Sequence, residues 1–271
     1  MRYSYDILLA GVGIGGPSHT TLGTVSLLRR ARVAFTLSVH AAWLRKICRR
    51  VVEVDERYYT GEEDAVVYRR LADVVLREAR NAGGVAWVED GHPLIYDDMC
   101  NDIKRRATRH GLRVTVLPAV SSLDTLVADH DVRFDSTGLQ IVEATSLVMA
   151  RQRLNPCFET LVLQLGWFGT SLLVPVVSHR EERFAPLQRY LRRFYPASHK
   201  VRILRARQFA RDGSPVVSCR LDRLSRQFRR IEVDSTLHLP PCEKEAAWDT
   251  ELAEQTTDRR RLDRIARVGR G

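Results

Sequence analysis

The segment Val85–Tyr96 reads Val-Ala-Trp-Val-Glu-Asp-Gly-His-Pro-Leu-Ile-Tyr, and it decides how the surrounding chain is interpreted. Its apolar run ends abruptly in Asp90-Gly91-His92-Pro93, and a helical pattern begins soon afterwards. A strand that ends in Gly-x-Pro turns sharply and leaves backbone groups free at its carboxyl end. Ligands bind at that end in open α/β sheets. The segment therefore predicts a buried strand that stops at a ligand-binding edge.

The chain on both sides of this segment alternates between strand-like and helix-like patterns. Tyr5–Val12 is an apolar run that enters a glycine loop, and residues 64–81 repeat apolar side chains at helical spacing. Up to about residue 130 the predicted order is β-α-β-α-β-α-β-α-β-α. Such an order indicates a parallel sheet with helices on both faces.

The second half of the chain has a different pattern. Five strands and one helix, near Phe184–Phe194, are expected here; the strands are Leu139–Glu143, Glu159–Leu165, Leu172–Val177, Lys200–Arg205 and Gln227–Val233. The change of composition lies at Asp131–Gly138. We expect an N-terminal α/β domain over residues 1–132, a mixed-sheet C-terminal α/β domain over 133–241, and a charged, partly disordered tail over 242–271.

The composition is that of an ordinary globular protein, with 44% hydrophobic and 28% charged residues in a chain of 271. No apolar run reaches the roughly 18 residues that a membrane helix needs, and the N-terminus lacks the features of a signal peptide. We expect a cytoplasmic protein without a membrane partner. The cysteines form no Cys-x-x-Cys pair, so free thiols are expected rather than a metal site or disulfides; they are Cys48, Cys100, Cys157, Cys219 and Cys242.

The net charge of +10 is concentrated in residues 131–271, which carry 25 Lys and Arg against 17 Asp and Glu. The arginines of residues 180–230 are interspersed with core-type residues. This arrangement is typical of a solvated surface rather than a nucleic-acid site. We expect no nucleic-acid partner, and the surplus leaves open an anionic substrate or peptide partner.

Gly11-x-Gly13-x-x-Gly16 lies between a predicted strand and a predicted helix, as the dinucleotide fingerprint does. The fingerprint also needs an acid at the end of the second strand. That strand ends in Ser38-Val39-His40, and no Lys follows Gly16 as a phosphate-binding loop would require. The loop permits close approach to a ligand, but the sequence does not support NAD or ATP.

Three segments together resemble the tetrapyrrole-methylase-type (class III) fold of S-adenosylmethionine (SAM) dependent methyltransferases. Leu9–Gly16 resembles the opening G-x-G-x-G motif, Gly91–Tyr96 the G-[DH]-P motif, and Pro118–Asp124 the P-G-[VI]-S-S motif, with Ala119 where glycine is usual. Within this superfamily the chain is most similar to borosin-type peptide backbone N-methyltransferases and their stand-alone bacterial relatives. Histidine at position 92, Ser18–Leu22 and Thr236–Pro241 carry that likeness.

The resemblance implies two α/β domains with SAM in the cleft between them, in a homodimer. It also implies which residues contact the cofactor. By position these are Gly11, Gly13, Gly91, His92, Pro93, Ser121, Ser122 and Gln164, with backbone near Leu239 and Pro240.

Methyl transfer is an in-line displacement, so most of its catalysis is positioning. An amide nitrogen is a poor nucleophile because its lone pair is delocalised, and its methylation needs a base for the N–H and donors for the imidate oxygen. The resemblance implies that Tyr58 and Tyr68 occupy the two catalytic tyrosine positions. Asp64 stands where the relatives carry an arginine, and an acid cannot stabilise an anionic oxygen as arginine does.

Three hypotheses follow for the function. The first is N-methylation of a peptide backbone amide, or a similar nitrogen, in a natural-product precursor supplied in trans. The second is C-methylation of a tetrapyrrole such as uroporphyrinogen or a precorrin, which an aspartate in place of His92 would have favoured. The third, suggested by Asp64, is a SAM-binding inactive partner or regulatory subunit.

Overall fold

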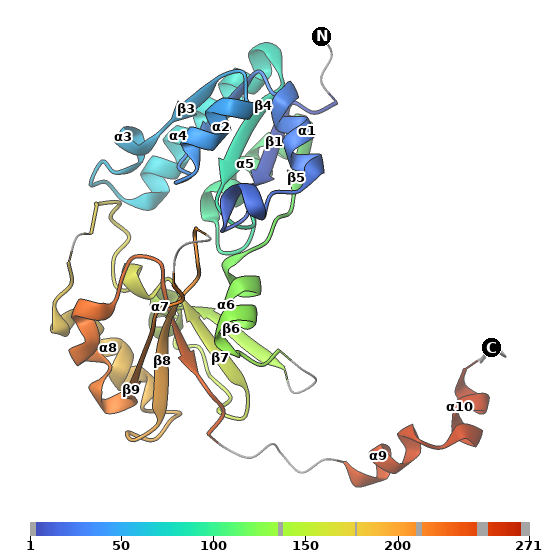
Figure 1. Cartoon of the computed structure of the whole chain (residues 1–271), viewed down its shortest axis with the longest axis vertical. Helices are drawn as coiled ribbons and strands as arrows, with labels where there is room; N and C mark the ends of the chain where they lie inside the picture. The colour runs from blue at the N-terminus through green and yellow to red at the C-terminus, as the bar shows by residue number, and fades with distance from the viewer. Residues whose placement is uncertain (1–3, 135–137, 177, 210–212, 243–248, 267–271) are drawn as a thin grey trace.

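The first domain is a five-stranded parallel sheet in the order β3-β2-β4-β1-β5. The structure is a computed structural model that describes residues 4–134, 138–176, 178–209, 213–242 and 249–266. The first and second domains lie one above the other (Figure 1). The strands of the first sheet are β1 (Ile7–Gly11), β2 (Val33–Thr36), β3 (Val51–Glu53), β4 (Val85–Glu89) and β5 (Val114–Leu117).

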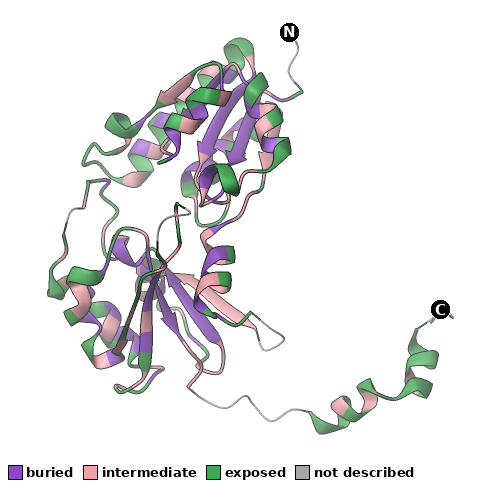
Figure 2. Cartoon of the chain, viewed as in Figure 1, coloured by how far each residue is buried: buried purple, intermediate pink, exposed green. Residues whose placement is uncertain are grey.

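Helices cover both faces of this sheet, as predicted, because alternate strand residues point to opposite faces. Ile7 and Leu9 of β1 pack with the apolar stripes of two helices on one face, and Leu8 and Ala10 pack with two helices on the other. Figure 2 shows the buried strands between these half-exposed helices. The first pair is α4 (Asp64–Ala82) and α5 (Asp98–Arg109), and the second is α1 (Leu22–Arg30) and α2 (Ala41–Ile47); the short helices η1 (Gly16–Ser18) and α3 (Asp55–Tyr58) complete this domain.

The second domain has a mixed sheet in the order β6-β7-β10-β8-β9. Only β6 and β7 pair in parallel; the other pairs are antiparallel. The mixed character was predicted. The elements are β6 (Leu139–Glu143), α7 (Ala144–Met149), β7 (Glu159–Leu163), η2 (Leu165–Trp167), α8 (Glu181–Leu191), β8 (Lys200–Arg205), β9 (Val216–Arg220), η3 (Leu221–Arg223), η4 (Ser225–Arg230) and β10 (Ser235–Leu239).

Two of the predicted strands in this domain are wrong. Residues 227–233 contain the end of η4, and the edge strand is β9 instead. Phe228 and Ile231 of this irregular segment pack against the core. Apolar residues that pack in this way suggested a strand in the sequence. Leu172 forms only an isolated bridge, to Glu63 of the first domain.

Helix α6 (Ser122–His130) packs on the second sheet, although the sequence places it in the first domain. Its Leu126 is fully buried in a cluster with Leu161, Leu163 and Leu204. The change from one core to the other therefore lies before Ser122, earlier than the predicted boundary. Helical periodicity shows that α6 has an apolar face but not which sheet that face meets.

The described part of the tail consists of α9 (Thr250–Thr256) and α10 (Arg259–Ile265), which bury no residue and extend away from both domains (Figure 1). The disorder predicted for the tail also concerns residues 243–248 and 267–271, which lie outside the described residues. The five cysteines, all within the described residues, form no disulfide, and Cys48 and Cys100 are buried. No helix within the described ranges is long and apolar enough to cross a membrane.

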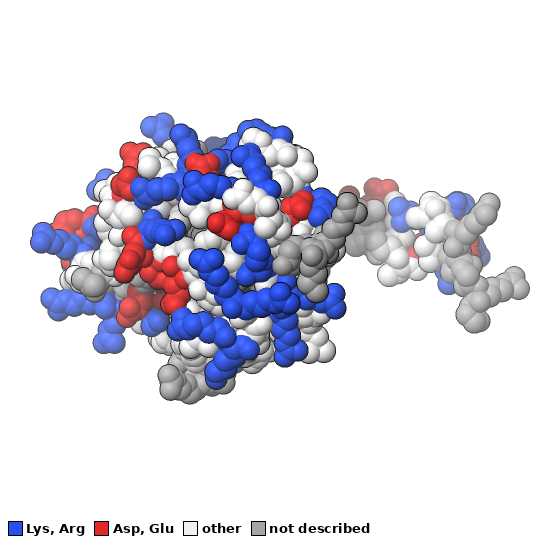
Figure 3. Space-filling view, turned by 90° about the horizontal axis from the view of Figure 1, so that it is seen from above, with Lys and Arg blue, Asp and Glu red and all other residues white. Residues whose placement is uncertain are grey.

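Lys and Arg are spread over the surface and interspersed with Asp and Glu. Figure 3 shows this mixture from above. On this face several Lys and Arg side chains also adjoin one another toward the lower middle of the view.

A segment of the second domain crosses to the first and pairs with the loop before α4. The N–H of Asp64 donates to Ser171 O at 2.8 Å, and Glu62 O accepts from the N–H of Leu173 at 3.0 Å. The Leu173 side chain, 4% exposed, enters the core formed by α4, α5 and the first sheet. We call Ser171–Leu173 the crossing segment.

Leu173→Ala should destabilise the protein by about 2–5 kcal/mol, because it leaves a cavity in the first core. Leu172→Ala is the matched control, since Leu172 is 45% exposed, and should change stability by about 0.5 kcal/mol or less. Urea unfolding followed by tryptophan fluorescence measures both. Equal effects of the two substitutions would show that the crossing segment is not anchored as described.

Candidate active site between the two domains

The ends of β1 and β4 and the segment after β5 meet at one edge of the first sheet. A Cβ added to Gly11 would lie 2.3 Å from Gly91 O and 2.9 Å from both Ala119 Cβ and Pro93 Cδ. Gly91 has φ 74°, a conformation that glycine adopts readily. Only glycine fits at position 11, so the three motifs quoted from the sequence are brought together here.

The glycine loop uses most of its backbone donors internally. Ile14 N–H donates to Val120 O, Gly15 N–H to His19 Nδ1 and Gly16 N–H to Gly13 O, each at 3.0 Å. Gly13 (φ 78°) lies so close to His19 that an added Cβ would be 2.3 Å from His19 Cβ. A phosphate-binding nest needs several free N–H groups, so this loop is not built as one.

His92, Ser121 and Ser122 lie beside this edge. Ser121 caps α6 and donates from Oγ to Asp124 Oδ2 at 2.7 Å, within a capping box. His92 Nδ1 accepts from the N–H of Leu94 at 3.1 Å. His92 Nε2 and Ser122 Oγ have no hydrogen-bond partner in the described parts of the chain, and are therefore the side-chain groups here that can turn to a ligand.

Gln164 joins this edge to the second domain. It follows β7 in a left-handed conformation (φ 56°) and donates from Nε2 to Tyr96 O at 3.2 Å. Tyr96 in turn donates from its hydroxyl to Ile141 O at 2.8 Å.

Leu239 and Pro240, also predicted at the cofactor site, are not brought to this edge. β10 runs antiparallel to β7 and pairs Leu239 with Thr160, near the start of β7, whereas Gln164 follows its end. The Leu239 side chain is fully buried in the core of the second domain.

A cavity of about 1060 Å³ lies between the domains, beside Tyr96 and Gln164. Its volume is large enough for a sizeable ligand. The lining includes both predicted catalytic tyrosines and parts of the crossing segment. Its charged residues are four acids and one base, namely Asp64, Asp98, Glu143, Glu182 and Arg183.

Tyr58 and Tyr68 form a pair in this cavity. Their hydroxyl oxygens are 3.4 Å apart and their ring centroids 6.1 Å apart. Burial, and then the neighbouring Tyr68, raise the pKa of Tyr58 well above its ordinary value. Burial, together with the charges of nearby acids, raises the pKa of Tyr68 to about 12. Both phenols are therefore protonated at neutral pH and can donate hydrogen bonds.

Arg183 of α8 is a cavity residue that the sequence did not reveal. Its Nε donates to Phe168 O at 2.6 Å, and Nη1 lies 3.0 Å from His179 Nδ1. Its Nη2 is buried without a partner among the described residues, and burial lowers its pKa. No local motif links Arg183 to the tyrosines, because Arg183 belongs to the second domain and the tyrosines to the first, and they share only the cavity between them.

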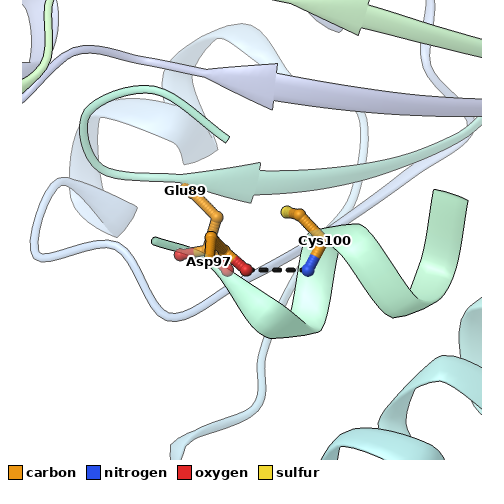
Figure 4. A group of neighbouring side chains, drawn as sticks. All are labelled: Glu89, Asp97 and Cys100. Atoms are coloured by element: carbon orange, nitrogen blue, oxygen red, sulfur yellow. Dashed lines mark hydrogen bonds between the residues drawn. The ribbon is translucent and has the colours of Figure 1, made fainter. Parts of the chain in front are cut away.

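Glu89, Asp97 and Cys100 form an acid cluster in which Cys100 is buried and the two carboxyl groups are half-buried (Figure 4). Asp97 caps α5 and accepts from the N–H of Cys100 at 2.7 Å, and Trp87 Nε1 donates to Glu89. The oxygen and sulfur atoms lie within 4.8 Å of one another. Burial raises the pKa of Asp97 to about 6 and those of Glu89 and Cys100 well above their usual ranges. This favours protonated groups, which are poor ligands for a cation.

The comparisons with known proteins agree with this geometry. Residues 6–206 match the family described as Tetrapyrrole (Corrin/Porphyrin) Methylases, and the chain belongs to that family. The resemblance stated from the three motifs is thereby confirmed.

Curated relatives are borosin precursors. The chain is 24% identical over 245 residues to a methyltransferase/ribosomally synthesized type I borosin cyclic peptide precursor of Mycena rosella, covering 87% of this chain and 60% of that protein. It is 29% identical over 168 residues to a type III borosin precursor of Anomoporia bombycina, covering 61% and 20%. The chain thus spans at most three fifths of the length of these two relatives.

Solved structures share the fold. Uroporphyrin-III-C-methyltransferase from Thermus thermophilus superposes with a TM-score of 0.63 at 18% identity, covering 87% of this chain and 91% of that one. A structure of the Thermus thermophilus enzyme complexed with S-adenyl homocysteine gives a TM-score of 0.57 at 18% identity, covering 86% and 96%. At this identity the likeness shows the two-domain fold.

The acid cluster predicts a pH dependence of stability. The pKa of Asp97 is raised in the folded state, so the unfolded chain ionises first as the pH rises, and stability should fall by about 1–3 kcal/mol between pH 4 and pH 7. Asp97→Asn keeps a capping side chain and should remove this part of the loss. Urea midpoints of both proteins at pH 4 and pH 7 measure it. An identical pH dependence in the variant would contradict the raised pKa.

Proposed function

We propose that the protein is a SAM-dependent methyltransferase that methylates the nitrogen of a peptide backbone amide, or a similar nitrogen. Membership of the methylase family and the borosin relatives support this proposal. The observation that carries it is the Tyr58–Tyr68 pair inside the interdomain cavity. A homodimer and a cytoplasmic location remain predictions from the sequence.

The edge of the first sheet fits the proposed cofactor. Gly91 leaves open space, since the nearest atom to an added Cβ is Ser121 Cα at 3.8 Å. His92 Nε2 and Ser122 Oγ can offer polar groups, and Gln164 of the second domain contacts Tyr96, which follows the Gly-His-Pro turn. When bound, SAM supplies an electrophilic methyl group on a sulfonium. The residues that would hold it are Gly11, Gly13, Gly91, His92, Pro93, Ser121, Ser122 and Gln164.

Tyr58 and Tyr68 would stabilise the developing negative charge on the amide oxygen. They are neutral donors in a largely buried site, where a fixed hydrogen bond to an oxyanion is worth more than in water. A tyrosinate base is disfavoured, because burial raises the pKa of both phenols.

Asp64 would then accept the amide proton. It lines the same cavity as the tyrosines, and its charge acts on Tyr68. One carboxylate oxygen accepts from the N–H of Ala65 at 2.5 Å, and the other has no bond to the described residues. Asp64 stands where the relatives carry an arginine. In this proposal the substitution supplies a carboxylate that receives the amide proton, besides removing the cation.

The charge of the cavity weighs against a tetrapyrrole substrate. Four acids and one arginine line it, and a macrocycle that carries several carboxylates would be repelled. A neutral amide faces no such repulsion, and the cationic methyl donor is attracted by acids.

Tyr58→Phe and Tyr68→Phe should each slow methylation of a precursor peptide roughly 10²–10³-fold, because a donor to the oxyanion is lost. Tyr59→Phe is the matched control, since Tyr59 is 40% exposed and lies outside the cavity lining. Mass spectrometry of the +14 Da product gives the rates, and calorimetry should show SAM affinity unchanged in all three variants. Full activity of Tyr58→Phe and Tyr68→Phe would rule out the assigned role.

The same assay tests Asp64. Asp64→Asn should lower the rate roughly 10²-fold or more through loss of the proton acceptor, whereas Glu63→Gln at the neighbouring exposed acid should not. A faster Asp64→Arg enzyme would show that Asp64 hinders the reaction.

A further inference from the structure

We propose that the groove between α4 and α5 binds an acidic stretch of the peptide substrate, a few residues away from the position that is methylated. The groove has a volume of about 1030 Å³. The inference rests on the proposed peptide-methylating function and adds to it the substrate's charge pattern.

The groove is continuous with the interdomain cavity. Asp64, Tyr68 and Asp98 line both. These residues lie in the first turns of α4 and of α5, and the groove continues along α5 to Arg109. A peptide whose amide lies at the tyrosine pair can therefore extend along α5 without leaving the surface.

The far part of the groove carries cations that lack a partner. Arg105 pairs with Asp102, and Arg106 pairs with Asp73 and Asp102. Arg69, Lys104 and Arg109 line the groove and are exposed, with no ion pair to any part of the chain that the structure describes. Arg105 and Arg109, four residues apart on α5, also repel each other. A bound anionic segment would relieve this repulsion.

The charges in the groove are separated along its length, which sets a register. Asp98 lies at the cavity end of α5, and Lys104 and Arg109 lie further along it. At 1.5 Å per residue these cations are about 9 Å and 16 Å from Asp98 along the helix axis. An extended peptide covers about 3.3 Å per residue, so its acidic residues should lie roughly three to five residues beyond the one that lies beside Asp98 at the mouth of the cavity. The acids at the mouth exclude the same residues from the cavity itself.

The groove suits carboxylates on a peptide better than a nucleic-acid backbone. A phosphate backbone carries a charge at every nucleotide, and the acids at the mouth, Asp64 and Asp98, would repel part of it. A peptide can place its acidic residues only where the cations lie.

Fluorescence anisotropy with two labelled peptides tests the proposal. One peptide carries three Glu residues, at positions three to five from a Val-Ala centre. It is made in two versions, with the Glu residues on the N-terminal or on the C-terminal side of that centre. The other peptide carries Gln at the same positions. We expect at least one Glu version to bind at least tenfold more tightly than its Gln counterpart at low salt, and the difference to shrink as salt rises.

Charge reversal locates the site. Lys104→Glu with Arg109→Glu should reduce Glu-peptide binding to the Gln level and should allow binding of a peptide with Lys in place of Glu. Arg77→Glu with Arg80→Glu is the matched control, because these residues are exposed on α4 outside the groove, and should leave the preference intact. The Lys-peptide rescue also shows that the groove variant is folded.

Several results would overturn the groove proposal. The first is equal binding of Glu and Gln peptides, and the second is an equal loss of Glu-peptide binding in the control variant. The third is displacement of the Glu peptide by RNA but not by other acidic peptides. The fourth is occlusion of the groove by a second copy of the chain at working concentration. Binding is measured without turnover, so the two proposals fail separately. Tight Glu-peptide binding without any methylation contradicts the proposed function, whereas methylation of Glu and Gln peptides with equal KM contradicts only the groove.

Discussion

The crossing segment is the constraint on which the site depends. The chain joins the domains covalently before α6, and a single covalent connection would leave them free to separate. The backbone bonds of Ser171 and Leu173 to the loop before α4 provide a second connection, each worth about 1 kcal/mol. Leu173 adds an apolar anchor in the first core, beside which Tyr58 and Tyr68 pack. The same contact therefore closes the cavity and positions the tyrosines.

The electrostatics of the cavity follow from burial more than from any one charge. Removal from water keeps the tyrosines protonated and raises the pKa values of the acid cluster. The charged groups that remain are acids at the rim and one partly unpartnered arginine. Such a site favours a cationic methyl donor and a neutral acceptor.

Local patterns in the sequence were sufficient for the first domain. The continuous apolar run of β1, which is buried along its whole length, and the helical spacing in α4 were both interpreted correctly. The sequence could not show that α6 packs on the second sheet, or that Leu172 pairs with Glu63, because those contacts join segments far apart in the chain. The segment at Gln227–Val233 was taken for a strand, but its first residues belong to η4 and of its apolar side chains only Ile231 is buried.

The residues of the candidate site also divide into those that the sequence predicted and those that it did not. Tyr58, Tyr68 and the glycine positions followed from motifs, since motif residues lie close together in sequence. Arg183 comes from the second domain and carries no motif. Leu239 and Pro240 were assigned by their order in the motif, and the antiparallel pairing of β10 with β7 placed them at the other end of the sheet.

A crystal structure of the protein with S-adenosylhomocysteine tests the central claim most directly. The account predicts that the ligand lies between the edge formed by Gly11, Gly91 and Ser122 and the side chain of Gln164. Its sulfur should face the cavity that contains Tyr58 and Tyr68. A ligand bound elsewhere, such as in the smaller cavity beside His19, Arg207 and Phe209, or with its sulfur directed away from the tyrosine pair, would contradict the account.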